Sequence, residues 1–361
     1  MRAATSPHAP TLITGGAGFI GTNLADRLLS MGRPVLIFDN LSRAGVRENV
    51  RWLKEQHNSS LQIEVADVRD ADAVARAVEQ CDAVYHLAAQ VAVTTSLEDP
   101  VHDFETNARG TLNVLEALRR RRPAAPLILT STNKVYGDLS DIYLRKLGHR
   151  YVPTQPAIRS KGVSESRPLS FHSPYGCSKG AADQYVLDYG RCYGMPTVVF
   201  RMSCIYGPHQ FGNEDQGWVA HFLIQARAGQ PIEIFGDGCQ VRDVLYVQDL
   251  VDALVLAGDA ANELGGQAFN IGGGAANTLS LLELLALMDE ERGLQAVTRF
   301  GPWRSGDQRY YVSDTRRFRA ATGWKPLIGA SEGVKKLLAW LESSSLPPRP
   351  PALRAAKVLH Q

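Results

Sequence analysis

The sequence predicts an α/β fold, a doubly wound parallel sheet joined to a smaller substrate-binding lobe towards the C-terminus. Three observations predict it. A short apolar strand, a glycine-rich turn and an amphipathic helix follow one another near the N-terminus, and strand and helix patterns then continue to alternate. At 361 residues the chain exceeds one average domain, yet it fits a single large core with an added lobe.

The composition is that of an ordinary soluble globular protein. Hydrophobic residues make up 44% and charged residues 21%, and the net charge of +2 indicates neither nucleic acid nor membrane as a partner. Residues 1–10 lack the apolar core of a signal peptide, and no apolar window long enough to span a membrane occurs. The cysteines are scattered without metal-ligand spacing, which predicts reduced thiols in a cytoplasmic protein and no metal site: Cys81, Cys177, Cys192, Cys204 and Cys239.

The first predicted strand, residues 11–14, runs into a glycine turn at residues 15–21, and a helix with an apolar face follows. Strand, glycine turn and helix in this order are the context in which such a pattern binds a dinucleotide. Glycines let the backbone approach a pyrophosphate, and the helix N-terminus offers it free N–H groups. The turn therefore predicts a Rossmann-type sheet and a dinucleotide site. The residues expected to contact the cofactor here are Gly15, Gly18, Phe19, Ile20 and Gly21.

The second predicted strand, residues 35–38, ends at Asp39. A carboxylate at this place accepts hydrogen bonds from both ribose hydroxyls of NAD and repels the 2′-phosphate of NADP. Arg43 lies close enough in sequence to leave NADP as an alternative. Asn40 and Ser42, in the same turn, are further expected contacts of the cofactor.

The strand pattern continues at residues 61–65 and 83–87, with a helical segment between them. Alternating strands and helices predict right-handed crossovers, and sheets of this kind bind ligands at the carboxyl ends of their strands. Asp67 and Ala88 follow two such ends, where adenine and the nicotinamide ribose are expected. His86 is expected to be a packed structural residue.

A helix is predicted from about Phe104 to Arg122, with Asn107 in its first half. It ends in four consecutive arginines, residues 119–122, directly before Pro123. Because cations at a helix C-terminus interact favourably with the macrodipole, we interpret this run as a helix end and not as a nucleic-acid-binding arm.

Two later segments carry residue types suited to proton transfer. The strand at residues 127–130 leads into Thr132, and Tyr175 precedes Lys179 by one helical turn. A free phenol with a pKa of ~10 is ionised in about one molecule per thousand at neutral pH, and a neighbouring ammonium lowers that pKa. We therefore predict that Lys179 activates Tyr175 as a base and that Thr132 binds the same substrate oxygen.

Together these motifs resemble the extended short-chain dehydrogenase/reductase family of nucleotide-sugar epimerases and dehydratases. The resemblance covers residues 11–345 and rests on the glycine turn, on Asp39, on Thr132 four residues before Tyr136, and on Tyr175-x-x-x-Lys179. It implies an isomerase with bound NAD that is not consumed. The further cofactor contacts that it implies are Asp67, Val68, Leu87, Ala88, Ala89, Gln90, Asn107, Thr130, Tyr175 and Lys179.

Several segments are similar, more narrowly, to family members that epimerise carbon 2 of a CDP-hexose. These segments are residues 38–43, 90–96, 131–138, 171–185 and 215–219. The similarity implies that Tyr175 removes the proton of the carbon-2 hydroxyl while hydride passes to NAD, and that Thr132 shares the bond to that oxygen. Hydride then returns to the other face of a 2-keto sugar.

Two departures from the family's patterns bear on the reaction. Dehydratases carry an acidic pair after the hydroxyl residue, where this chain has Asn133 and Lys134. Many 4-epimerases have an asparagine three residues after the arginine that matches Arg201, where this chain has Cys204. Both departures favour carbon 2. A UDP- or GDP-sugar 4-epimerase is one alternative, and a non-catalytic NAD(H) sensor or scaffold is another.

Arginines of the lobe suit a diphosphate, because guanidinium groups bind phosphate oxygens bidentately and stay charged. By resemblance Arg242 and Arg304 hold it, whereas Arg309 is either a second candidate or a surface residue. Trp218 either stacks on the base or fills the lobe's small core. The predicted substrate contacts are Thr132, Asn133, Lys134, Cys204, Gln216, Trp218, Arg242, Arg304 and Arg309.

The polar connection at residues 138–172 is predicted to be a substrate-side flap, and residues 346–361 a flexible tail. Apolar helical faces after Asn107 and after Tyr175 resemble those that pair in family dimers, so a homodimer or homotetramer is expected. The NAD-binding domain is predicted to span residues 11–203 and 241–258, and the nucleotide-sugar lobe residues 204–240 and 259–345.

Overall fold

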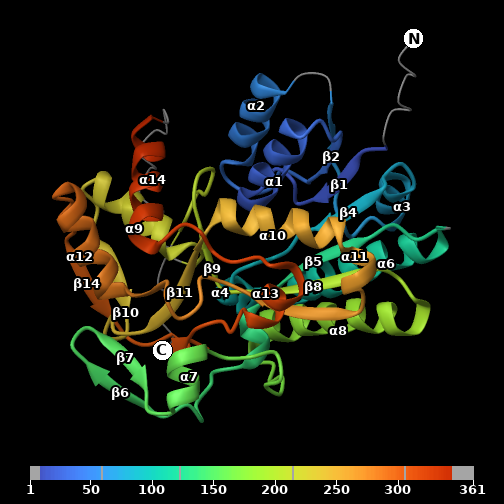
Figure 1. Ribbon diagram of the computed structural model, residues 1–361. Helices are drawn as coiled ribbons and strands as arrows, with labels where there is room; N and C mark the ends of the chain where they lie inside the picture. Colours follow the sequence, from blue (N-terminus) through green and yellow to red (C-terminus); the bar gives the residue numbers. More distant parts are fainter. Residues whose placement is uncertain (1–8, 58–59, 122, 214, 305, 344–361) are drawn as a thin grey trace, which may run out of the picture.

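The computed structural model describes residues 9–343, except 58–59, 122, 214 and 305. At its centre lies a parallel sheet with the strand order β12-β8-β5-β4-β1-β2-β3 (Figure 1). The predicted Rossmann-type fold is thereby confirmed, whereas the predicted tail lies outside the described residues. The strands are β1 (Thr11–Thr14), β2 (Val35–Phe38), β3 (Leu61–Glu64), β4 (Ala83–His86), β5 (Leu127–Thr132), β8 (Thr197–Met202) and β12 (Gln267–Ile271).

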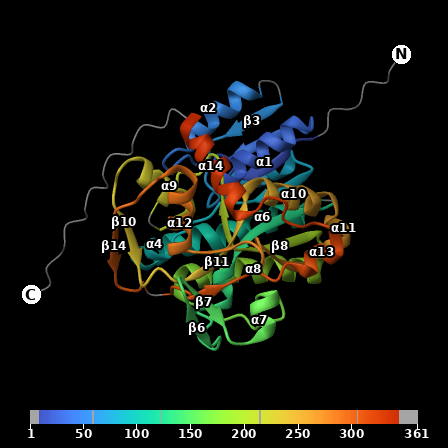
Figure 2. The same cartoon turned by 60° about the vertical axis from the view of Figure 1, so that its left-hand side comes forward.

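Helices cover both faces of this sheet, which explains why its central strands are continuous apolar runs instead of alternating ones. Burial is complete or nearly so along β1, β2 and β5. One apolar core joins the sheet to α1 and α10, and a second joins it to α3, α6 and α8 (Figure 2). The flanking helices are α1 (Phe19–Ser30), α2 (Val46–Gln56), α3 (Ala71–Glu79), α6 (Gly110–Arg120), α8 (Ser173–Tyr193), α10 (Val247–Asp259), α11 (Ala261–Leu264) and α13 (Arg316–Thr322).

The strand order reverses between β1 and β4, and this reversal opens the crevice in which such sheets bind ligands. The turns after the two strands lie in contact there. A Cβ atom added to Gly15, whose φ is +68°, would stand 2.7 Å from the backbone nitrogen of Ala88. Glycine is therefore required where the first turn passes the end of β4.

The smaller lobe packs around its own apolar core. Its capping box is formed by Ser280 and Glu283 at the start of α12. Its sheets contain β9 (Cys204–Tyr206), β11 (Val241–Tyr246), β13 (Thr278–Ser280) and β15 (Tyr310–Tyr311), and β10 (Ile232–Phe235) with β14 (Thr298–Gly301). Its helices are α9 (Trp218–Arg227), α12 (Leu281–Arg292) and α14 (Ala330–Ser343).

The sheets divide the chain differently from the predicted domain boundaries in two places. Strand β12 lies within the range 259–345 assigned to the lobe, but it pairs with β8 of the large sheet. Strand β11 lies within the range 241–258 assigned to the large domain, but it pairs with β9, β13 and β15. Both boundaries are therefore shifted along the chain, because an apolar strand pattern does not show which sheet a strand joins.

The connection at residues 138–172 is folded, and its predicted role as a substrate-side flap stays a prediction. It contains the hairpin of β6 (Leu144–Leu147) and β7 (Arg150–Pro153), followed by α7 (Pro156–Lys161). Lys146 and Tyr151 both contact the Asp237 carboxylate, at 3.2 and 2.8 Å, and so attach the hairpin to the lobe. The polar composition of the segment concealed this structure.

The helix predicted at residues 104–122 is divided into three parts. A π-helical turn, η1 (Glu105–Arg109), separates α5 (Pro100–Phe104) from α6, and α4 (Val93–Glu98) precedes them. Arg119 forms an ion pair of 2.7 Å with Glu116 near the end of α6, in keeping with an ordinary helix terminus. Among the described residues, no helix has both the length and the apolar character needed to cross a membrane.

Candidate active site

The glycine turn forms a cradle at the N-terminus of α1. Gly18 is the N-cap, no side chain caps the helix, and its first turn carries no acidic residue. Phe19 and Ile20 open the helix and pack against the core. The backbone N–H groups of this turn are therefore available to an anion, and the residues present fit a pyrophosphate.

We expect Gly18→Ala to fold normally and to weaken NAD binding about tenfold or more, which is ~1.4 kcal/mol or more. The added Cβ atom meets only the Gly15 carbonyl oxygen, at 3.1 Å, but it occupies the surface that a pyrophosphate must approach. The NAD content of the purified protein and its melting temperature would be measured together.

Gly21→Ala is the matched variant. Its Cβ atom would stand 2.6 Å from both the Gly15 carbonyl oxygen and the Gly16 Cα atom, so it should lower the melting temperature. A Gly18→Ala protein that keeps its full NAD content would contradict the role of this turn.

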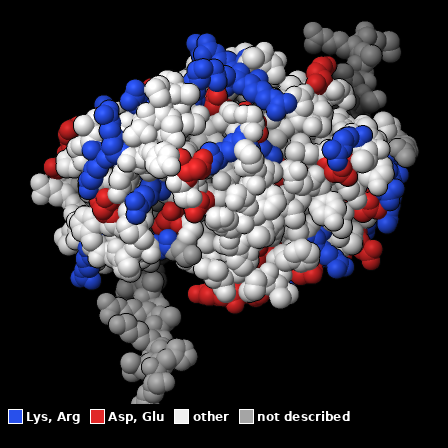
Figure 3. Space-filling view, turned by 90° about the horizontal axis from the view of Figure 1, so that it is seen from below, with Lys and Arg blue, Asp and Glu red and all other residues white. Residues whose placement is uncertain are grey.

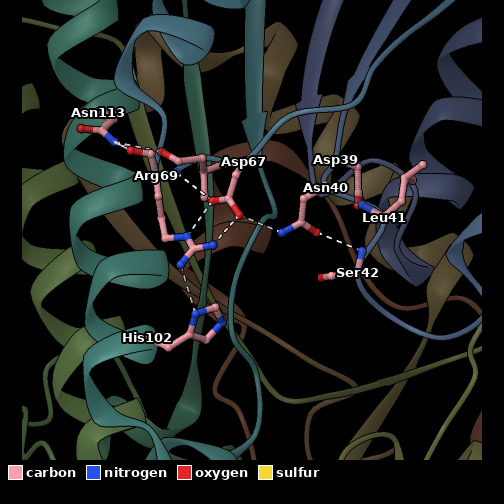
Figure 4. A network of polar contacts seen from close by, with 9 residues as sticks. Asp39, Asn40, Leu41, Ser42, Asp67, Arg69, His102 and Asn113 are labelled. Atoms are coloured by element: carbon pink, nitrogen blue, oxygen red, sulfur yellow. Dashed lines mark hydrogen bonds and ion pairs between the residues drawn. The ribbon is translucent and has the colours of Figure 1, made fainter.

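The carboxylates after β2 and β3, Asp39 and Asp67, belong to a network of polar contacts at the ends of the two strands (Figure 4). Asp39 accepts the backbone N–H groups of Ala17 and Leu41, at 3.1 and 2.8 Å. Burial raises the pKa of Asp39, and these two hydrogen bonds oppose the rise. Asn40 donates to the Asp67 carboxylate at 2.9 Å, which links the ends of the two strands.

Arg69, which the sequence analysis did not identify, holds Asp67 in place. Its guanidinium group donates to both Asp67 oxygens, each at 2.9 Å, and this pairing holds the pKa of Asp67 well below its usual range. Val68 is buried against the core, and its carbonyl oxygen accepts a bond from Asn113. In the sequence, this pairing was indicated by the Asp-x-Arg spacing of residues 67 and 69.

Arg43 is directed towards the lobe. Its guanidinium group donates to the side-chain oxygen of Gln216, while the Ser42 N–H donates to Asn40 at 3.1 Å. Arg43 also lies near enough to Tyr175 to lower the pKa of that phenol. Arg43 was the residue that left NADP open as the cofactor. In the structure its guanidinium group is bound to Gln216.

Asn107 of the π-helical turn η1 binds the segment 87–90 that follows β4. The Asn107 side chain accepts the Gln90 N–H at 2.9 Å and donates to the Gln90 carbonyl oxygen at 3.1 Å. His86 is buried between the hydroxyls of Thr14 and Thr111, and burial lowers its pKa to about 3. It is therefore neutral and packed, as expected. Leu87, Ala88 and Ala89 line the switch point beside Gly15.

The residues predicted for proton transfer are brought together where β5 meets α8. Tyr175 and Lys179 are both buried, one turn apart near the start of α8. Thr132 lies near enough to Tyr175 to lower the pKa of its phenol, and the Lys179 ammonium donates to the Thr130 carbonyl oxygen at 2.7 Å. Ser96 accepts the Tyr175 N–H at 3.2 Å and anchors this turn.

The predicted lowering of the Tyr175 pKa by Lys179 is wrong for the chain taken by itself. Burial raises the pKa of Tyr175 to about 12, and Thr132 only partly opposes the rise. Burial also lowers the pKa of Lys179 to about 8, against the opposing charges of Asp183 and Asp103. Both groups are thus held towards their neutral forms, because the site is dry.

A second group of polar side chains lies on the lobe side of Thr132. Asn133 is buried and donates to the Gln308 side chain at 3.1 Å, and the Lys134 ammonium donates to the Gly306 carbonyl oxygen at 2.8 Å. Arg242 donates to the Gln308 carbonyl oxygen at 2.6 Å. Gln308, absent from the predicted site, therefore joins the end of β5 to Arg242.

The remaining predicted substrate contacts lie around this group. Arg304 lies over the Phe235 ring at 4.4 Å and pairs with Asp307 and Asp215 at 3.3 and 3.6 Å. Arg309 lies over the rings of Trp303 and Tyr151, at 5.2 and 5.9 Å, so it is packed as well as charged.

Trp218 packs on the lobe's core, which favours the core-filling alternative. Its indole N–H donates to the Cys204 sulfur at 3.3 Å, and its ring meets Phe222 edge-on at 5.9 Å. Cys204 is thereby placed between the lobe core and the cations Lys134 and Arg242, whose charges lower its pKa while burial raises it more.

Comparisons with known proteins agree with this geometry. Residues 11–272 match the NAD dependent epimerase/dehydratase family. The chain is 44% identical over 339 residues to the CDP-paratose 2-epimerase of Salmonella typhi, covering 92% of this chain and 99% of that protein. It is 34% identical to the UDP-glucose 4-epimerase of Mycolicibacterium smegmatis, covering 93% of this chain and 99% of the other.

The fold is similar to that of solved enzymes. The UDP-glucose 4-epimerase of Thermus thermophilus, in complex with NAD, superposes with a TM-score of 0.78 at 32% identity over 93% of this chain and 99% of the other. The expected NAD cofactor and the expected isomerase class are confirmed by these similarities. The chain belongs to the NAD-dependent epimerase/dehydratase family.

Proposed function

We propose that this protein inverts carbon 2 of a CDP-hexose of the CDP-paratose or CDP-tyvelose type, through a transient 2-keto sugar. The observation that carries the proposal is that Tyr175 and Lys179 are buried one turn apart on α8, where Lys179 is bound to the end of β5 that carries Thr132. The similarity to the Salmonella typhi CDP-paratose 2-epimerase supports the choice of carbon and of base.

NAD, when bound, accepts a hydride, returns it, and brings a positively charged ring to the site. The protein supplies the proton chemistry. Tyr175 takes the proton of the sugar hydroxyl, and Thr132 hydrogen-bonds to the same oxygen. Lys179, held by the Thr130 carbonyl oxygen, adds positive charge beside the phenol. Because burial opposes ionisation of Tyr175, the base becomes effective mainly when further positive charge enters the crevice.

The residues after Thr132 disfavour a dehydration. Removing water from the sugar needs an acid and a base beside each other, and dehydratases place two acidic residues there. Here Asn133 cannot titrate, and its amide is bound to Gln308. Lys134 is a single titratable group where dehydratases have two. Transfer of a hydride away from and back to one carbon requires neither group.

Three cations surround the space that we assign to the diphosphate. Burial lowers the pKa of both Lys134 and Arg242, and the Arg304 charge lowers both further, whereas Asp307 raises both. Such a cluster is unfavourable alone and is stabilised by a dianion. We propose that Arg242, Arg304 and Lys134 bind the diphosphate, and that Arg309 borders the base.

Binding of the nucleotide should weaken as the pH rises through the Lys134 pKa. Burial, reinforced by Arg242, lowers that pKa to about 8, so Lys134 is charged below this pH and neutral above it. We expect the Kd for CDP to rise about tenfold between about pH 7 and about pH 9. Isothermal titration calorimetry would measure it.

Lys134→Met is the control for this prediction. It should bind CDP weakly at both pH values and lose the dependence. If CDP binding by the wild type and by Lys134→Met depended equally on pH, the dependence would belong to another titratable group.

A panel of CDP-, UDP- and GDP-sugars deuterated at carbon 2 tests the proposed reaction, followed by proton NMR. Inversion at carbon 2 with the deuterium retained supports a hydride that stays on the enzyme. Loss of deuterium to water would indicate enolisation. Inversion at carbon 4 would establish the 4-epimerase alternative, which the 34% identity to the Mycolicibacterium smegmatis enzyme keeps open.

We also propose that the protein is at least a homodimer. Large apolar side chains are exposed on α4, α5 and α8, and the face seen from below has a wide area without charged residues (Figure 3). Sedimentation equilibrium would give the mass of the assembly. The exposed apolar side chains that support the proposed dimer are Leu97, Val101, Phe104, Tyr185 and Tyr193.

The free thiols of all five cysteines support a cytoplasmic location.

A further inference from the structure

A carboxylate that the proposed reaction does not use is buried below the catalytic helix. The Asp103 side chain of α5 is fully buried. It accepts a hydrogen bond from the Ser178 hydroxyl and another, at 3.1 Å, from the Asn107 amide. No cation forms an ion pair with it among the described residues, so its charge must be balanced from a greater distance.

The π-helical turn η1 places these groups together. Asn107 follows Asp103 by four residues, and its amide also donates to Ser178 at 3.0 Å. Single π-helical turns often occur at functional sites, because they turn a side chain inward. Ser178 directly precedes Lys179, and its hydroxyl lies 3.2 Å from the Tyr175 carbonyl oxygen. Asp103 therefore contacts the same helical turn that carries the catalytic pair.

The charged groups around the pair come from several elements. Asp103 acts from α5 on both Tyr175 and Lys179, raising both pKa values. Asp183 acts on Lys179 from α8, but it is bound to Arg201 at 2.8 Å. The other groups are Arg43, which lowers the Tyr175 pKa, His86, which is neutral, and His102, which acts on Asp103.

We propose that Asp103 is a positioning residue that serves, together with Asp183, as a buried counter-ion of Lys179 and sets the pH range in which Tyr175 and Lys179 work as a pair. Asp183 has the larger effect on Lys179 but is also paired with Arg201, whereas Asp103 acts on both members of the pair. Burial disfavours the Asp103 charge, and the Ser178 hydroxyl, Lys179 and His102 favour it. Lys179 and Asp103 thus keep each other charged in a dry site.

Asp103→Asn removes one negative charge and keeps the shape of the side chain. Without that charge the Lys179 ammonium is less stable, so its pKa falls from about 8. The Tyr175 phenolate is more stable, so its pKa falls from about 12. Both limbs of the pH profile of kcat/KM should therefore move to lower pH, each by about one unit. A residue that only supports the fold would lower activity without moving either limb.

Two readouts on the NAD-loaded protein test this. The first is the pH profile of kcat/KM on the sugar nucleotide that the panel identifies. The second is the titration of Tyr175 by NMR in protein labelled with [ζ-¹³C]tyrosine, its signal assigned by comparison with Tyr175→Phe. The kinetic readout rests on the proposed function, whereas the NMR titration does not. If no sugar turns over, the proposed function fails and the titration still decides the role of Asp103.

Ser178→Ala is the matched comparison, because it removes one hydrogen bond that supports the Asp103 charge but keeps the carboxyl group. It should move the Tyr175 titration less than Asp103→Asn does. If Asp103→Asn does not fold, Asp103→Ala makes the same change in charge and should give the same shift. A Tyr175 titration that is unchanged when the Asp103 charge is removed, or that moves equally in Ser178→Ala, overturns the proposal.

Discussion

Replacing Tyr175 with Phe lowers kcat by about 10³-fold, with the NAD content and the melting temperature nearly unchanged. The phenol is the group that we propose takes the hydroxyl proton, and general base catalysis contributes about 10²- to 10⁴-fold. The aromatic ring, which packs at the start of α8, is preserved. Steady-state kinetics on the identified sugar nucleotide would measure the loss.

Tyr189→Phe is the control on the same helix. Its hydroxyl donates to Glu116 at 2.7 Å, away from the crevice, so its removal should leave kcat unchanged. Comparable activity in Tyr175→Phe and the wild type would exclude the proposed base. Biological output that persists without turnover would favour the sensor alternative.

The largest effect on stability is expected for Asp183→Asn. Asp183 and Arg201 form a bidentate ion pair between α8 and β8, at 2.8 and 2.9 Å, and both side chains are buried, with 0% and 5% exposed. The substitution leaves a buried guanidinium group without its counter-charge, which costs about 3–5 kcal/mol. Urea denaturation at a fixed NAD concentration would measure the change in the free energy of unfolding.

Asp188→Asn, five residues further along α8, is the control. Asp188 pairs with Arg191 on the surface, where solvent and salt screen the charges, so its loss should leave the unfolding midpoint unchanged. Equal effects of the two substitutions would show that the buried pair is not what holds α8 to the sheet.

Much of the large domain could be predicted from the sequence, because its signals are local. The glycine turn, the strand ending at Asp39 and the helical spacing of Tyr175 and Lys179 each depend on neighbours within a few residues. The structure places them on β1, β2 and α8 as expected. The hairpin at residues 144–153 was not predicted, because its strands are short and mostly polar and depend on the lobe for support.

The contacts that decide the chemistry could not be predicted in this way. Asn133 meets Gln308 across 175 positions, and Arg43 meets Gln216 across 173. No sequence pattern reports such pairs, since they depend on how β5, the lobe and the crevice are packed together. The sequence predicted that Lys179 lowers the Tyr175 pKa, whereas burial raises it. The spacing of the two residues was known from the sequence, but their burial was not.

The sequence alone therefore determined the fold class, and with the family resemblance it determined the cofactor, since the glycine turn and the strand pattern depend on backbone requirements within a few residues. It also predicted the proton-transfer pair, whose role remains a proposal. Only the tertiary structure decided how those residues are charged and held. Burial and distant partners such as Asp103 set the cost of ionising a side chain, and both arise from packing between elements far apart in the chain.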